Sequence, residues 1–217
     1  MADGTAITGT SYFRPDTRFP IFQSLYTGKG SVLGEPMINM PSKSLVGAVR
    51  WFKKPHLVLQ YPNGIETDLT VAGNAYTPPD KGFPVLGLDN VAVGQTNAKV
   101  QFAGGDIESA AQFLKLPQVC RITNTHTVTF STSVLVNPTA MRITTLNSKT
   151  GFFKGSFTLK DRLPVVSRSV SFEGVLDSVL GTGTGFFQLS ELPTPPATSV
   201  ARTLQRAGTV YLLPPGM

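Results

Sequence analysis

The two ends of this 217-residue chain carry the same order of strand and turn signals. Residues 5–52 and 150–213 each contain a strand-like run with a central Gly, a charged turn, and a second alternating run. A Gly-x-Gly step follows, then a third run and, after a Pro/Ser/Thr-rich connection, a fourth. Because period-two alternation broken by glycine is typical of antiparallel strands, the repetition predicts two related four-strand units.

The second copy is longer between its corresponding glycines, as expected if its turns carry insertions. The same order of signals can also arise by coincidence in a glycine-rich all-β chain. The pseudo-repeat 5–52 and 150–213 is therefore a hypothesis about architecture, and residues 54–140 form an unduplicated middle between its copies.

Composition favours many short strands over long helices. Charged residues make up only 15% of the chain, whereas it contains 21 Gly, 17 Pro and 14 Phe. One stretch, residues 107–116, has helical spacing of apolar side chains, with Asp106 as a candidate cap and Pro117 as a stop. The middle region otherwise predicts a meander of short strands.

These signals predict an all-β fold with a single domain over residues 1–217. We expect an antiparallel β-barrel built from the two related four-strand units, the central meander and one short helix, because closure removes exposed sheet edges. A β-sandwich is the alternative, since periodicity does not distinguish it from a barrel.

The residue inventory argues against several kinds of site. Cys120 is the only cysteine and cannot form an internal disulfide. His56 and His126 are far apart and lack zinc-site spacing. The Gly-x-Gly steps lie between strand-like runs and do not open a helix that would hold a phosphate. No catalytic residue, metal or cofactor is predicted.

Binding through exposed side chains is the remaining class of site. Aromatic residues at strand ends or in a Pro-rich loop can stack on a sugar or a base. The densest basic cluster, Arg50, Lys53 and Lys54, lies beside the aromatic residue Trp51. The exposed end of a strand would also explain these charges without a ligand. The predicted ligand-binding residues are Trp51, Tyr61, Tyr76, Arg50, Lys53 and Lys54.

The formal net charge of +6 favours an acidic partner such as nucleic acid, an anionic glycan or a membrane surface. The basic residues are not interleaved with aromatic ones, which argues against nucleic acid. The chain shows neither the basic and apolar regions of a signal peptide nor an apolar run long enough for a transmembrane segment.

Six segments carry a family resemblance when taken in order: 20–34, 45–51, 76–79, 150–157, 172–176 and 183–187. They resemble a β-rich domain that recurs near the C-termini of large secreted or surface proteins of environmental bacteria, often beside immunoglobulin-like or other adhesive repeats. The resemblance implies an extracellular or cell-surface domain of a larger precursor. It assigns no catalytic residue.

The function expected from these observations is a non-enzymatic extracellular or cell-surface module that binds a surface polymer such as a glycan or serves surface assembly. One alternative is a hydrolase whose site combines distant residues, such as His56 or His126 with an acid. Another is a structural subunit that forms fibres or homo-oligomers through unpaired edge strands.

Overall fold

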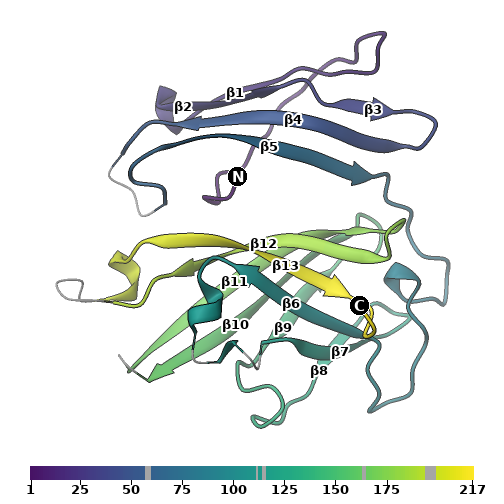
Figure 1. Cartoon of the computed structure of the whole chain (residues 1–217). Coiled ribbons are helices and arrows are strands. Elements are labelled where there is room, and N and C mark those ends of the chain that lie inside the picture. The colour runs from purple at the N-terminus through teal and green to yellow at the C-terminus, as the bar shows by residue number, and fades with distance from the viewer. Residues whose placement is uncertain (57–59, 111, 114–115, 163–164, 194–198) are drawn as a thin grey trace. The chain divides into compact units, whose positions relative to one another are not determined.

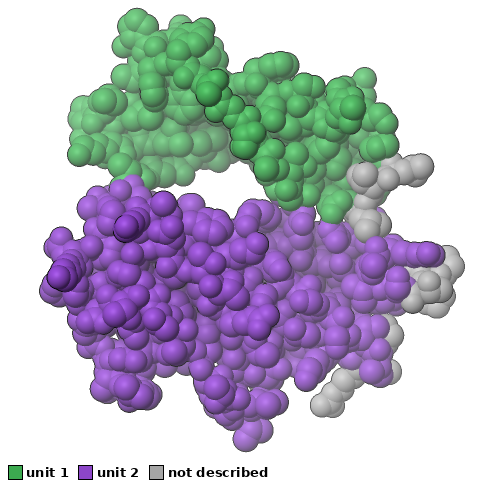
Figure 2. Space-filling view, turned by 180° about the vertical axis from the view of Figure 1, so that it is seen from behind, with its two compact units in different colours: residues 1, 3–75 green, residues 2, 76–217 purple. Residues whose placement is uncertain are grey.

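The computed structural model describes residues 1–56, 60–110, 112–113, 116–162, 165–193 and 199–217. Its chain divides into two compact units, coloured separately in Figure 2. Unit 1 contains Met1 and Asp3–Ala75, and unit 2 contains Ala2 and Tyr76–Met217. The described residues form thirteen strands and short 3₁₀ turns but no α-helix, so the predicted all-β class is confirmed.

Unit 1 is a five-stranded antiparallel sheet organised around one long central strand. Its strands are β1 (Ile21–Leu25), β2 (Gly30–Gly34), β3 (Met37–Asn39), β4 (Ser44–Lys53) and β5 (Ile65–Asn74). β4 pairs with β2 and β3 on one side and with β5 along its whole length on the other. Alternate residues of β4 are buried, among them Val49 and Trp51, so one face of the sheet carries the core of this unit.

Unit 2 is built on an eight-stranded antiparallel sheet that closes almost completely into a barrel (Figure 1). Its strands are β6 (Ala98–Gly104), β7 (Gln118–Ile122), β8 (Val128–Phe130), β9 (Arg142–Leu146), β10 (Phe152–Arg162), β11 (Val165–Asp177), β12 (Thr182–Ser190) and β13 (Gln205–Leu213). Their order is β8-β7-β6-β13-β12-β11-β10-β9, and the two edge strands approach each other without forming a ladder. The predicted antiparallel barrel-like architecture is therefore confirmed.

Aromatic rings fill the interior of unit 2. The ring centroid of Phe102 lies 4.7 Å from that of Phe157, 5.4 Å from Phe172 and 5.5 Å from Phe187. All four side chains are buried. Such tilted and edge-to-face contacts stabilise a core beyond the burial of apolar area alone.

Glycines opposite these rings make the packing possible. Gly155 pairs across the ladder with Phe172, and Gly208 pairs with Phe187. A Cβ at either glycine would overlap the ring of its partner. Much of the Gly and Phe pattern in the sequence therefore specifies a core, which explains its regularity without a ligand.

Replacing Gly155 by Ala tests this packing. The added Cβ would overlap the Phe172 ring and the Arg142 carbonyl, so we expect a loss of about 1–3 kcal/mol in the free energy of unfolding. Chemical denaturation followed by circular dichroism measures it. Gly73→Ala in β5 is the control, because a Cβ there meets no atom within 4 Å. Equal effects at both positions would contradict the packing argument.

The two predicted copies fall in different sheets. The last three runs of the first copy become β1, β2 and β4, and those of the second become β11, β12 and β13. Each set consists of antiparallel neighbours with a Gly-x-Gly step at its first turn. The first runs differ: residues 152–159 lie in β10, whereas residues 6–13 form no strand. The barrel-like sheet thus contains only the second copy, and the repeat and the single domain stay predictions.

The helix predicted over residues 107–116 is wrong where the structure describes it. Ile107–Ser109 form a single 3₁₀ turn, Ala110 is extended, and Asp106 makes no cap. Positions 111, 114 and 115 lie outside the described residues. Ten residues are too few for a helix stable by itself. The apolar side chains of Ile107, Ala110 and Leu116 are instead buried in the core of unit 2.

Candidate functional site

Two of the predicted binding residues are internal. The side chain of Trp51 is 1% exposed, and its Nε1 donates a hydrogen bond to Tyr26 Oη at 2.9 Å. Lys53 is 4% exposed, and its Nζ donates to Asp3 Oδ2 at 2.9 Å and to the Gln60 carbonyl at 2.8 Å. The same ammonium lies 4.6 Å from the centroid of the Tyr26 ring. These residues stabilise unit 1 and face no solvent.

Burial and hydrogen bonding shift the pKa values of Asp3 and Tyr26 in this cluster. Burial by itself would raise the pKa of Asp3, but hydrogen bonds from Tyr26, Lys53 and Thr5 outweigh it and lower that pKa. Burial, together with the hydrogen bond to Asp3, raises the pKa of Tyr26 to about 12. At neutral pH the cluster therefore contains a carboxylate and a neutral phenol.

The other two predicted aromatic residues are half-buried. Tyr61 packs edge-on against Trp51 with ring centroids 5.2 Å apart. Tyr76 belongs to unit 2, where its hydroxyl donates to the Ser148 carbonyl at 2.8 Å. Burial raises the pKa of both tyrosines. Neither ring is fully exposed as a stacking platform.

The remaining predicted cations, Arg50 and Lys54, are exposed. Arg50 lies on the outer face of β4 and is already paired, at 3.0 Å with Asp68 and at 3.5 Å with Glu66 on β5. Lys54 directly follows β4. The structure thus divides the six predicted residues between a cluster around Trp51, an exposed strand end with Arg50 and Lys54, and a separate unit that contains Tyr76.

The two histidines do not form the site that the hydrolase alternative requires. His56 Nδ1 lies 3.4 Å from Lys29 Nζ, and the buried His126 Nδ1 has no hydrogen-bond partner among the described residues. Within the described part of the chain, neither imidazole is hydrogen-bonded to a carboxylate, and no group of acidic, His or Cys side chains is suited to a metal ion. These positions lend that hypothesis no support.

A different surface gathers polar side chains on the outer face of unit 2. Ser167, Ser169 and Ser171 alternate in β11 with buried residues, so their side chains lie outside the barrel. On β10, Ser156 and Thr158 lie on the same face. The ladder pairs Ser156 with Ser171, Thr158 with Ser169, and Lys160 with Ser167. We call Ser156, Thr158, Ser167, Ser169 and Ser171 the hydroxyl face.

Two exposed cations flank the hydroxyl face. Arg142 on β9 pairs with Ser156, and its Nε donates to the Ser156 hydroxyl at 3.2 Å. Lys160 lies four residues beyond Ser156 on β10, which places the two positions about 13 Å apart along the strand. The pairing of β9 with β10 and the length of β10 therefore set the spacing of positive charge.

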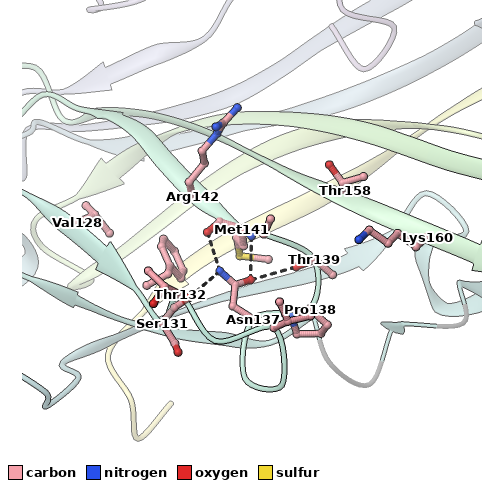
Figure 3. Close-up of a pocket in the computed structure, with 13 residues that line it drawn as sticks. Val128, Ser131, Thr132, Asn137, Pro138, Thr139, Met141, Arg142, Thr158 and Lys160 are labelled. Atoms are coloured by element: carbon pink, nitrogen blue, oxygen red, sulfur yellow. Dashed lines mark hydrogen bonds between the residues drawn. The ribbon is translucent and has the colours of Figure 1, made fainter.

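A pocket of about 400 Å³ adjoins the hydroxyl face and is lined by residues of β8, β9 and β10 and of the loop between β8 and β9 (Figure 3). Arg142, Thr158 and Lys160 line it from the sheet. The loop 131–141 lines it from the other side, and the Thr158 N–H donates to the Thr139 carbonyl at 2.8 Å to tie that loop to β10. The other described lining residues are Val128, Phe130, Ser131, Thr132, Val134, Asn137, Pro138, Ala140 and Met141.

Asn137 gives the loop its shape. Its Nδ2 donates to the carbonyls of Ser131 at 3.2 Å and Met141 at 3.0 Å, and its Oδ1 accepts from the Met141 N–H at 2.8 Å (Figure 3). One buried amide thus closes both ends of the loop. The wall of the pocket is therefore formed before any ligand binds.

The chemistry of this site is cationic and hydroxyl-rich. No carboxylate occurs among the described residues that line the pocket. Hydroxyls both donate and accept hydrogen bonds, and small side chains leave the face open to an extended ligand. Serine at every second position of 167–171 was visible in the sequence, but the placement of Arg142 and Lys160 around it required the pairing of β9, β10 and β11.

No family model matches the chain, and no curated protein or solved structure matches it. In the described residues, no helix has the length and apolar character needed to cross a membrane. The assignment of function therefore depends on the chemistry of the hydroxyl face and its pocket.

Proposed function

We propose that this chain is a non-enzymatic extracellular or cell-surface module that binds an anionic glycan on the hydroxyl face of unit 2. The observation that carries the proposal is the array of five hydroxyl side chains between Arg142 and Lys160, beside a pocket of about 400 Å³. A glycan chain offers many hydroxyls to such an array, and its acidic groups meet the cations.

Charge and geometry favour an acidic polymer over a neutral one. Hydrogen bonds between a cation and an anion are stronger than those between neutral groups. Arg142 and Lys160 stand about 13 Å apart along β10, a separation that suits groups repeated along an extended chain better than one small anion. The net charge of +6 adds a favourable long-range field.

Isothermal calorimetry with a uronic-acid oligosaccharide and a neutral oligosaccharide of equal length tests the proposal. We expect the acidic ligand to bind and the neutral one to bind at least about tenfold more weakly, because each charged hydrogen bond contributes roughly 1.5–3 kcal/mol. The double variant Arg142→Ala with Lys160→Ala should lose most of the affinity for the acidic ligand.

A matched control separates the site from general electrostatics. Lys81→Ala with Lys149→Ala removes the same total charge from two exposed positions of unit 2 and should bind as the unmodified protein does. Ser169→Tyr leaves the charge unchanged but covers the centre of the hydroxyl face and should abolish binding. Unchanged binding in Ser169→Tyr, or equal losses in both double variants, would refute the proposed site.

A further inference from the structure

The loop beside the pocket presents three consecutive apolar side chains to solvent. Val134, Leu135 and Val136 are 71%, 87% and 53% exposed. We call these three residues the apolar tip. Single exposed apolar residues are ordinary on a protein surface, but three in succession at a loop end mark a surface that contacts an apolar partner.

Hydrogen bonds inside the loop fix the backbone of the apolar tip. The N–H of Leu135 donates to the Ser133 hydroxyl at 3.3 Å. The N–H groups of Val136 and Asn137 both donate to the Ser133 carbonyl, at 3.1 Å and 2.7 Å. Backbone donors that enter a lipid phase need internal partners because hydrocarbon offers none. The N–H groups of Leu135 and Val136 in the tip, and of Asn137 directly after it, already have such partners.

Positive charge lies at the base of the same loop. Val134 lines the pocket together with Arg142 and Lys160, and no carboxylate occurs among the described residues lining it. Apolar side chains that enter the acyl boundary, with cations behind them at the level of anionic headgroups, are the arrangement by which peripheral proteins bind a bilayer surface.

From this combination we infer that the apolar tip inserts into the surface of an anionic lipid bilayer, with Arg142 and Lys160 held at its headgroups. The inference goes beyond glycan binding, because it uses the tip of the loop and not the hydroxyl face. It assigns to unit 2 a second binding surface, which shares Arg142 and Lys160 with the proposed glycan site and adds the apolar tip.

Co-sedimentation with vesicles of phosphatidylcholine and phosphatidylglycerol in equal parts measures the binding. The full chain should bind these vesicles, and should bind vesicles of phosphatidylcholine alone more weakly. Val134→Ser, Leu135→Ser and Val136→Ser together should reduce partitioning at least about tenfold. The side chain of Asn137 closes the loop in this variant as before.

The turn between β11 and β12 supplies the matched control. Val179 and Leu180 are 69% and 62% exposed there. This turn follows the C-terminal end of β11, whereas the hydroxyl face lies in the first half of that strand, and the turn carries the carboxylate of Asp177. Val179→Ser with Leu180→Ser should leave vesicle binding unchanged. Absence of binding by the full chain, or equal losses in the two variants, would overturn the inference.

A fluorescence measurement reports insertion directly. The chain has one tryptophan, Trp51, which is buried, so Leu135→Trp adds a single exposed indole. Its emission should shift to the blue on addition of anionic vesicles, and that of Leu180→Trp should not. Calorimetry with the soluble acidic oligosaccharide should be unaffected by Leu135→Ser with Val136→Ser, because neither residue lines the pocket. Failure of lipid binding and failure of glycan binding therefore give different results.

Discussion

Asp161→Ala is expected to destabilise unit 2 by about 3–5 kcal/mol, because it leaves a buried guanidinium without its anion. Arg168 Nε donates to Asp161 Oδ2 at 2.8 Å, and Nη2 donates to Oδ1 at 3.1 Å. Both side chains are buried, and Arg168 also donates to the Ser190 carbonyl at 2.7 Å. After the substitution, the Ser190 carbonyl would be the remaining partner of Arg168 among the residues that the structure describes.

Denaturant unfolding followed by far-ultraviolet circular dichroism measures the loss. Glu191→Ala is the matched control: it removes the carboxylate of the exposed pair between Glu191 and Arg206, which are 2.6 Å apart, and should cost at most about 1 kcal/mol. Asp161→Leu with Arg168→Met removes both charges and should be less destabilising than Asp161→Ala. A double variant that is worse than the single one would contradict the argument from an unpaired charge.

This ion pair also bears on the binding face. Asp161 follows Lys160 in β10, and Arg168 lies between Ser167 and Ser169 in β11. The side chains of Asp161 and Arg168 therefore lie together on the inner side of the sheet, opposite the hydroxyl face. The bidentate contact therefore joins the two strands directly behind the hydroxyl face. If the hydroxyl face binds a glycan as proposed, Asp161→Ala should weaken that binding through loss of register, because both charges lie behind the face.

Period-two alternation was sufficient to predict the strands that carry most of unit 2. It identified residues 152–159 of β10 and 170–176 of β11, where buried and exposed residues alternate. The strands extend further, β10 to Arg162 and β11 from Val165, into the segment where the sequence predicted a charged turn. Helical periodicity, in contrast, gave a wrong prediction at residues 107–110, where the helical spacing of apolar residues proved to be coincidental. Burial of Ile107 and Ala110 in the barrel core, and not helix formation, explains why those positions are apolar.

The predicted binding residues illustrate why a site is harder to predict than a strand. Lys53 shares a face of β4 with Val49 and Trp51, so alternation placed its side chain inward. A buried lysine requires an anionic partner, and Asp3 lies fifty positions away in the sequence, where no local pattern connects them. The sequence pattern did not determine the register of β9, β10 and β11 either. The register matters because a shift of one residue would turn the side chains of the hydroxyl face inward.

The cluster around Lys53 leads to the second large effect, the loss of stability in unit 1 when its anion is removed. Asp3→Ala would leave the Lys53 ammonium buried, with the Gln60 carbonyl and the Tyr26 ring as its partners among the described residues. We expect a loss of about 3–5 kcal/mol. Trp51 fluorescence follows unfolding of this unit, because the only tryptophan of the chain donates its Nε1–H to Tyr26 within the cluster.

Two further variants sharpen this result. Asp68→Ala breaks the exposed pair with Arg50 on the same sheet and should change stability little. Asp3→Asn with Lys53→Met removes both buried charges and keeps an oxygen to accept the Tyr26 hydroxyl, so it should be less destabilising than Asp3→Ala. The argument fails if Asp68→Ala and Asp3→Ala lower the unfolding midpoint equally.

The pKa shifts predict the pH range in which unit 1 is stable. The pKa of Asp3 in the folded chain lies below its ordinary value of 3.8, so its contribution to stability is present above that pH and is lost as the pH falls through the folded value. The pKa of Tyr26 is raised from 10.0 to about 12, so its contribution is present below pH 10 and is lost as the pH rises toward 12. The midpoint of unfolding followed by Trp51 fluorescence should therefore fall at both low and high pH. Asp3→Asn should make the fall at low pH, the acid limb, shallower while the fall at high pH persists. An acid limb that is unchanged in Asp3→Asn would show that other carboxylates cause it.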